Sequence, residues 1–187
     1  ESISISAFGG CEQLRSLNIP SLEMWLNIKI DRVNSFDNIF FLENMRLIAG
    51  GSVVEELVVT ENISGIGAYV FSGYKYLRSV TIDADIGEIG ERAFAECENL
   101  ESVSISGRIS QIGEYAFLWC DGLKEATVSG VEVIGAGAFY DCYNLETVVF
   151  GDGVEIIEEN SFLYCRNLHN MVIPSNIQKI EAIIDID

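Results

Sequence analysis

One pattern recurs along this chain and constrains its fold more than any other feature. Six segments of 17 residues align without a gap, beginning at Ile3, Ile66, Ile89, Ile112, Ile134 and Ile157. Each has Phe at its sixth position and Leu at its twelfth, and from Phe71 onward the Phe recurs after 23, 23, 22 and 23 residues. Such periods are typical of solenoids, in which a unit buries its apolar face only against the next unit. The sequence therefore predicts a repeat solenoid.

Each period divides into a strand, a turn and a return. The stretch Leu-x-x-Val-x-Ile, as in 100–105, predicts a short strand with its apolar residues inward. After a Gly- or Asp-containing turn, a second apolar pair returns the chain on the opposite side. We expect the glycine of the Ile-Gly step, as at Gly90, to permit a positive φ or a close contact between coils; Glu158 replaces it in one coil, so a positive φ is not an absolute demand. The short Ala-Phe-x-x-Cys segment predicts one 3₁₀ or α turn. The predicted fold is thus a mainly β solenoid with short helical turns and a parallel sheet of short strands.

The full repeat, Ile-Gly-x-x-Ala-Phe-x-x-Cys-x-x-Leu-x-x-Val-x-Ile, is complete in residues 89–105. It resembles the BspA-like leucine-rich repeats of bacterial, and some protist, cell-surface proteins. The similarity covers residues 1–19 and 63–180. It implies a right-handed leucine-rich-repeat solenoid, surface exposure, and a role in adhesion or protein binding.

We expect a single domain, 1–187, with four parts. Residues 1–19 form a partial first coil, 20–62 an elongated variant coil, 63–180 the regular repeats, and 181–187 an atypical end. Between Ile19 and Ile66 the chain has about 40 residues more than a regular coil. Within this insertion 45–48, Gly50-Gly51 and 56–60 predict a β-hairpin with a glycine turn. Trp25 could belong either to the core or to the surface.

The charge balance bears on partners. With 11 Lys+Arg against 29 Asp+Glu, the net charge is −18, which argues against nucleic acid and anionic membranes as ligands. The apolar runs are far shorter than the roughly 20 residues that span a bilayer, so we expect no membrane insertion. The acidic residues provide solubility or meet a basic partner or cation; no stretch has the dense Asp/Asn loop of an EF-hand. No signal peptide is visible, and the resemblance implies an extracellular or cell-surface location.

The cysteines occupy one repeat column, in which Tyr74 substitutes once; they are Cys11, Cys97, Cys120, Cys142 and Cys165. Residues of one column lie about 4.8 Å apart with parallel side chains, whereas a disulfide needs converging Cβ atoms about 3.8 Å apart. The column therefore predicts free core thiols, with one opportunistic bridge as the alternative. Converging Cys-x-x-Cys zinc ligands are absent, so we expect no metal and no cofactor.

Catalytic candidates are few. His169 is the only histidine, at an outward position that is charged in the other repeats. The pairs Glu158-Glu159 and Asp185/Asp187 could imitate a glycosidase dyad, but exposed turns favour solvated carboxylates. We predict that the chain is not an enzyme.

Two surfaces are candidates for binding. Outward strand positions form columns rich in short hydroxyl residues, and the candidate contacts there are Ser102, Ser104, Glu125, Thr127 and Thr147. The alternative is that such residues simply suit a sheet face. The turns of consecutive coils carry Tyr115, Trp119, Tyr140, Tyr143 and Tyr164. Partly exposed Trp and Tyr are typical of protein and carbohydrate contacts; packing between turns is the alternative.

These features predict a non-catalytic cell-surface or secreted interaction module that binds host protein, matrix or glycan. The alternative is a structural spacer or display segment of a larger surface protein. The first repeat begins mid-coil at Ile3, which favours that alternative.

Overall fold

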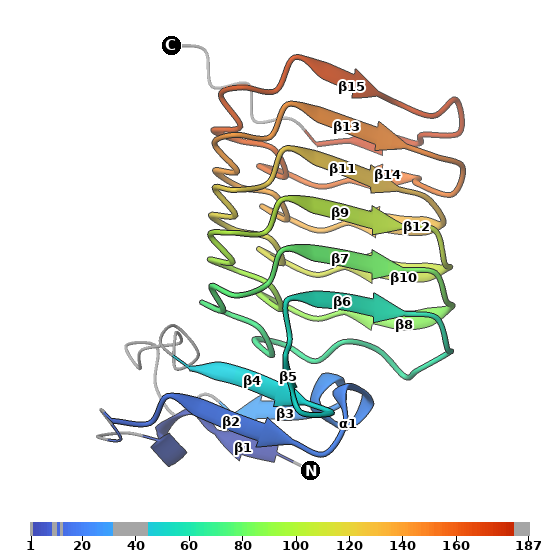
Figure 1. Ribbon diagram of the computed structural model, residues 1–187. Helices are drawn as coiled ribbons and strands as arrows, with labels where there is room; N and C mark the ends of the chain where they lie inside the picture. Colours follow the sequence, from blue (N-terminus) through green and yellow to red (C-terminus); the bar gives the residue numbers. More distant parts are fainter. Residues whose placement is uncertain (1, 9–10, 12, 32–44, 182–187) are drawn as a thin grey trace.

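The computed structural model describes residues 2–8, 11, 13–31 and 45–181, and its coils stack into a solenoid with two parallel sheets (Figure 1). The main sheet has six strands in the order β15-β13-β11-β9-β7-β6. Their bounds are β6 (Glu56–Val59), β7 (Ser79–Ile82), β9 (Ser102–Ile105), β11 (Glu125–Val128), β13 (Thr147–Phe150) and β15 (Asn170–Val172). Every neighbouring pair in it is parallel, because each strand occupies the same place in its coil.

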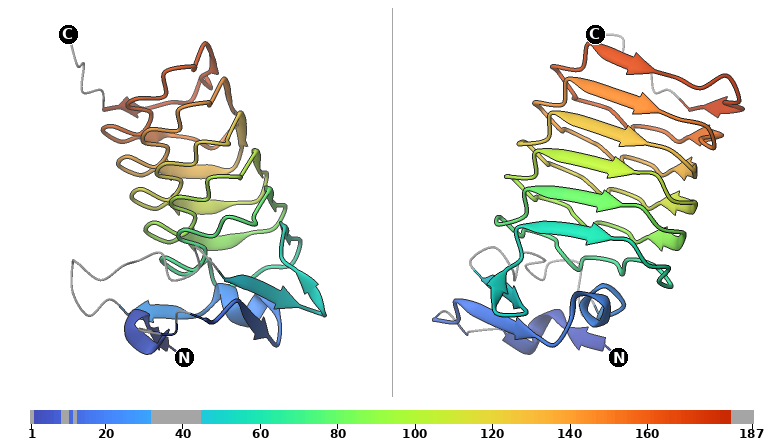
Figure 2. Two further views of the ribbon diagram at one scale, coloured as in Figure 1. Left: turned by 60° about the vertical axis from the view of Figure 1, so that its left-hand side comes forward. Right: turned by 45° about the vertical axis from the view of Figure 1, so that its right-hand side comes forward.

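The second sheet lies behind the main sheet, and both stacks run along the solenoid (Figure 2). Its strands are β8 (Ile86–Ile89), β10 (Ile109–Ile112), β12 (Val131–Ile134), β14 (Ile156–Ile157) and β16 (Lys179–Ile180). They are ordered β16-β14-β12-β10-β8 and are parallel. The predicted solenoid, with parallel sheets of short strands, is confirmed.

The core is formed by the repeat columns that the sequence places inward. In β9, Val103 and Ile105 are buried, whereas Ser102 and Ser104 face outward. The Phe side chains stack ring on ring: Phe94 and Phe117 have centroids 5.1 Å apart, and Phe117 and Phe139 5.0 Å apart, with interplanar angles of 8°. Apolar side chains of one coil thus complete the burial of the next.

The Ala-Phe-x-x-Cys segments differ in form from the expected helical turn. They consist of successive β-turns, with Ala93 N–H donating to Gly90 O and Cys97 N–H to Phe94 O. The third residue of each of these two turns has a left-handed backbone, with φ of 51° at Arg92 and 58° at Glu96. A helix cannot contain these positive φ values. Within the described residues, only the first repeat has a 3₁₀ helix, at Ile5–Phe8.

The Ile-Gly step is explained by close contact between coils and not by positive φ. A Cβ on Gly90 would lie 2.5 Å from the backbone N of Ala68, and one on Gly113 2.7 Å from the carbonyl of Ile89. Neither glycine has a positive φ, so that half of the expectation was wrong. Glu158 occupies the equivalent position in a later coil, where its carboxylate accepts a hydrogen bond from Ala136 N–H at 2.9 Å.

The cysteine column forms a ladder of thiol hydrogen bonds. Each buried Sγ donates to the carbonyl of the repeat Phe of the preceding coil: Cys97 to Phe71, Cys120 to Phe94, Cys142 to Phe117 and Cys165 to Phe139, at 3.2, 3.2, 3.1 and 3.0 Å. All five cysteines are free, as predicted. Cys11 is exposed, however, which corrects the expectation that the whole column is core. The thiols satisfy backbone acceptors in addition to filling space.

The N-terminal region has its own small sheets. The strands β1 (Ser2–Ser4) and β3 (Lys29–Asp31) pair in parallel, as do β2 (Ser16–Ile19) and β4 (Arg46–Ala49). The predicted glycine turn is present, because Gly50 and Gly51 have φ of 58° and 84°. The second hairpin strand is nevertheless β5 (Ser52–Val53), antiparallel to β4. The predicted partner, 56–60, instead contains β6 of the main sheet.

Two buried aromatic residues join this region to the regular coils. Trp25 of α1 (Leu22–Leu26) is 1% exposed, and its Nε1 donates to Val70 O at 2.9 Å, so it belongs to the core. The hydroxyl of Tyr74, which replaces the repeat Cys, donates to Val54 O at 2.9 Å and accepts from Leu47 N–H at 3.2 Å. Tyr74 therefore links the first regular coil to the backbone of the hairpin region through its hydroxyl.

Candidate functional site

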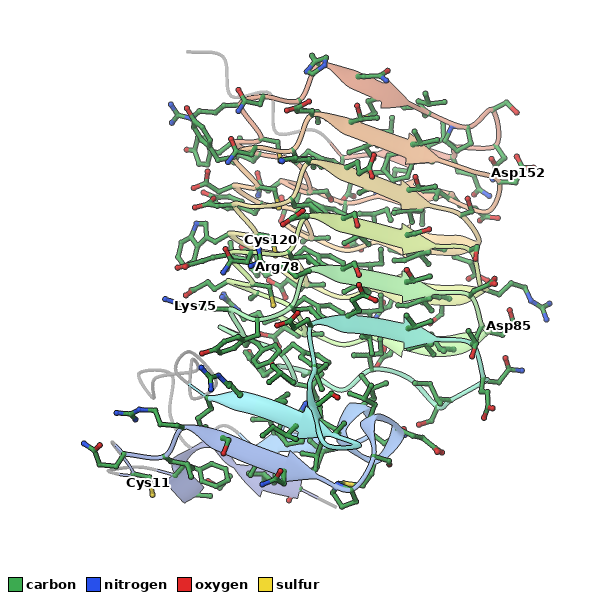
Figure 3. The ribbon with its side chains drawn as sticks, viewed as in Figure 1. Cys11, Lys75, Arg78, Asp85, Cys120 and Asp152 are labelled. Carbon is green, nitrogen blue, oxygen red and sulfur yellow. The ribbon has the colours of Figure 1, made fainter. Side chains whose placement is uncertain are left out.

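The first candidate surface is the aromatic ridge, which consists of Tyr115, Trp119, Tyr140, Tyr143 and Tyr164. It belongs to the turns at the start of the main strands, on the side where Lys75 and Cys120 are labelled in Figure 3. Tyr115 and Tyr140 have ring centroids 6.1 Å apart, and Tyr140 and Tyr164 5.3 Å apart, both in edge-on arrangements. The structure thus brings three of the five predicted residues into contact across three coils.

The other two ridge residues stand apart. Trp119 is 44% exposed and Tyr143 48%, and neither makes a ring contact within the described part of the chain. Tyr164 is 41% exposed. Packing between turns therefore explains why Tyr115 and Tyr140 are aromatic. Trp119, Tyr143 and Tyr164 still leave a large part of their apolar surface in contact with solvent.

Charged groups border the ridge. The guanidinium of Arg92 lies 4.8 Å from the ring centroid of Tyr115, within cation–π range. Partial burial, followed by the nearby Asp141 carboxylate, raises the pKa of Asp121 above its ordinary value. Burial, followed by the neighbouring Tyr164, raises the pKa of the Tyr140 hydroxyl. The Tyr140 hydroxyl is therefore neutral at physiological pH.

Three ridge residues have an unusual backbone conformation. Tyr115, Trp119 and Tyr164 have φ of 55°, 56° and 64°. Every regular coil has two such left-handed positions, the second residue before the repeat Phe and the second residue after it. Gly137 and Gly73 fill them in two coils, with φ of 60° and 74°. The fold therefore demands the conformation, and bulky side chains adopt it here against their intrinsic preference.

The second candidate surface is the outward face of the main sheet. The register pairs Glu125 with both Ser102 and Thr147, and Thr127 with Ser104, so the predicted residues do lie together. Ser102, Glu125 and Thr147 line an open hollow of about 410 Å³, together with Glu101, Lys124 and Glu146. This end of the sheet face is therefore more charged than the weakly charged strip that the hydroxyl residues suggest.

The sequence interpretation missed how charges alternate beside this face. The residue preceding each main strand alternates in sign along the stack through Glu55, Arg78, Glu101, Lys124 and Glu146, and His169 holds this position before β15. Arg78 Nη1 lies 3.2 Å from Glu101 Oε1. Comparing the sign of the charge at this repeat position from coil to coil, and not only its expected exposure, would have revealed this ladder of alternating charges. His169 ends it, with its Nδ1 2.8 Å from Asn167 O.

The catalytic candidates are not arranged as a site. Glu158 is half-buried and is engaged with the Ala136 N–H, while Glu159 is exposed. Asp185 and Asp187 lie outside the described residues. In the described ranges, no group of three or more His, Cys, Asp or Glu side chains could hold a metal ion. None of the helices described there has the length and apolarity needed to cross a membrane.

The repeat geometry agrees with comparisons with known proteins. A family model for the BspA type leucine rich repeat region, in six copies, matches residues 50–169 and 112–184. The chain belongs to the BspA-type leucine-rich repeat family. The resemblance seen in the sequence is thus confirmed, and the family is one of repeat proteins. No curated protein is significantly similar to the chain.

Solved structures of leucine-rich repeat proteins share the fold of this chain at low sequence identity. A leucine-rich repeat protein from T. pallidum is 17% identical, with a TM-score of 0.56 over 90% of this chain and 70% of that one. One from Eubacterium ventriosum is also 17% identical, with a TM-score of 0.55 over 89% of this chain and 57% of that one. The chain therefore matches between 57% and 70% of the length of these two proteins.

Proposed function

We propose that this BspA-type chain is a non-catalytic interaction module, secreted or displayed at a cell surface, that binds a protein, matrix or glycan ligand through the aromatic ridge. The ridge lies on consecutive coils, so one ligand can contact several of its rings at once. Family membership supports the proposal, because solenoids present extended surfaces for binding. The sheet face, with Ser102, Ser104, Glu125, Thr127 and Thr147, supplies additional polar contacts.

The observation that carries this proposal is Trp119. Its backbone is left-handed, a conformation that costs a residue with a Cβ about 1–2 kcal/mol. Its side chain is 44% exposed, so nearly half of this large side chain remains in contact with solvent. Gly73 holds the equivalent position in another coil, where φ is 74°. The fold therefore does not require Trp at this position, whereas Trp is among the residue types most enriched where binding energy concentrates.

The chain contains two tryptophans, which makes a direct assay available. Trp25 is buried and Trp119 exposed, so acrylamide should quench mainly the fluorescence of Trp119. Fluorescence titrations against a panel of matrix proteins and glycans should identify a ligand that protects Trp119 from quenching. Immobilised panel members then provide a readout that does not depend on tryptophan.

The test variants are Trp119→Gly, which suits the left-handed backbone, and Tyr143→Ala. We expect each to weaken binding of the ligand at least tenfold while the protein stays folded. Val172→Thr is the matched control, because Val172 is an exposed apolar residue on the main sheet, away from the ridge. Binding that survives both ridge variants unchanged would remove the ridge as the binding site and favour the spacer alternative.

A further inference from the structure

The main sheet is interrupted at β6. In the described part of the chain its strand order ends with β6, which pairs only with β7. The neighbouring sheet, in the order β2-β4-β5, ends with β5. The hairpin pairs β5 with β4, so the edge of β4 that faces β6 does not pair with β6 as neighbouring strands of regular coils do. Figure 1 shows β4 and β5 below β6, with β5 leading up to it. Among the described residues, the hairpin thus leaves the second edge of β6 without a paired strand.

A groove follows this edge. One hollow, of about 340 Å³, is lined by Ser52, Val53, Glu55, Glu56 and Leu22 among others. A second hollow, of about 200 Å³, is lined by Leu22, Leu26, Val58 and Glu61 among others. Because Leu22 lines both, the hollows adjoin, and together they accompany β6 from its first residue past its last. We call this feature the β6 groove.

The chemistry of the β6 groove differs from that of the strands next to it. Val58 is 54% exposed, whereas Thr81, Ser104 and Thr127 hold the same outward position in β7, β9 and β11. Val returns at this position only in the distant strands β13 and β15, as Val149 and Val172. Four carboxylates line the groove, those of Glu23, Glu55, Glu56 and Glu61, and no Lys or Arg does. None of the four forms an ion pair with a described residue. The groove therefore combines apolar surface with four carboxylates and no basic side chain in its lining.

We propose that the β6 groove binds an extended basic segment of a partner protein, which adds as a strand to the free edge of β6. Unpaired N–H and C=O groups of an edge strand bind a peptide backbone, and flanking pockets select alternate side chains. Lys or Arg side chains on the outward face of the segment meet the carboxylates, and their aliphatic stems cover Val58, which lies on the same face of β6 as Glu56. Small apolar side chains on the other face contact Leu22. This site is separate from the aromatic ridge and does not depend on it.

The test uses a blocked octapeptide that alternates Lys with Val or Thr, titrated into the ¹⁵N-labelled chain. We expect the amide signals of 55–61 to shift, and hydrogen exchange to slow at amides of 56–60 that face the free edge. Glu56→Lys should weaken peptide binding about tenfold, since it replaces attraction by repulsion. Val58→Thr, which installs the residue of the neighbouring coils, should weaken it several-fold. Glu132→Lys on the exposed face of β12 is the matched control and should change binding less than twofold.

Three results would overturn this inference. Equal weakening by Glu56→Lys and Glu132→Lys would mean that the peptide responds only to the net charge. Equally tight binding of an all-Lys octapeptide would exclude the apolar contact. Shifts confined to Trp119 and its neighbours, or no binding at all, would exclude the groove. Trp119→Gly should leave peptide binding unchanged, so failure of the ridge and failure of the groove are distinguishable.

Discussion

Replacing Tyr74 by Phe tests how the N-terminal region is attached to the regular coils. The change removes only the hydroxyl, which donates to Val54 O at 2.9 Å and accepts from Leu47 N–H at 3.2 Å. Leu47 and Val54 are buried, so both backbone groups would lose their partner away from water. Each such group costs about 1–3 kcal/mol, and we expect Tyr74→Phe to lower the free energy of unfolding by about 2–6 kcal/mol in urea denaturation.

The matched control is Tyr76→Phe. The ring of Tyr76 packs against Tyr74, with centroids 5.7 Å apart, and no hydrogen bond of its hydroxyl to a described residue is present. We expect this control to change the unfolding free energy by less than about 0.5 kcal/mol. Equal costs for the two variants would refute the view that the Tyr74 hydroxyl joins the two regions.

The same hydroxyl predicts a dependence on alkaline pH. Burial raises the pKa of Tyr74 to about 12, above the value of about 10 for an unfolded tyrosine. A raised pKa means that the folded chain holds the proton more tightly. The associated stability, about 3 kcal/mol, is therefore complete below about pH 10 and is lost as the pH rises toward 12. The difference in stability between wild type and Tyr74→Phe should accordingly shrink between about pH 10 and 12.

Three further predictions address the repeat core. Burial raises the pKa of the column thiols, so a thiol reagent at neutral pH should modify only Cys11 in the folded chain and all five cysteines after denaturation. Phe117→Ala, within the stack, should cost about 3–5 kcal/mol; Phe162→Ala should cost less, because Phe162 is only partly buried. Gly107→Ala should prevent close stacking, since its Cβ would lie 1.8 Å from Ala84 O, whereas Gly50→Ala meets nothing within 4 Å and should cost about 1 kcal/mol for its positive φ. Circular dichroism during urea denaturation measures these differences.

The repeat made the architecture predictable. Positions that recur as Phe, Leu, Val and Ile are buried in the inner coils, because stacking forces each column into the same environment there. The pairing of Ser102, Glu125 and Thr147 followed from the same periodicity. Each of these positions recurs several times, so an exceptional residue in one coil does not obscure the pattern.

Features that occur once were harder to predict. The antiparallel partner of β4 is only Ser52–Val53, because the chain must turn back early to begin β6. Cys11 matches the repeat column but is exposed, so a motif position alone did not determine burial. The hydrophobic pattern also gave no sign of the left-handed residues, since Tyr, Arg, Glu and Trp are not expected at positive φ. The β6 groove arises from this same irregular region, so the repeat pattern could not predict it.

Variation between coils of this one chain also separates folding from recognition. The repeat Phe is present in every coil, but the second residue after it is Gly73, Glu96, Trp119, Asp141 and Tyr164 in successive coils. All five have a left-handed backbone, so the fold fixes the conformation there and leaves the side chain open. Outward strand positions are less free, because β-propensity favours Ser, Thr and Val beside one another. A ligand specific for this protein should therefore bind at the turns, where a change of side chain alters the surface without altering the stacking of the coils.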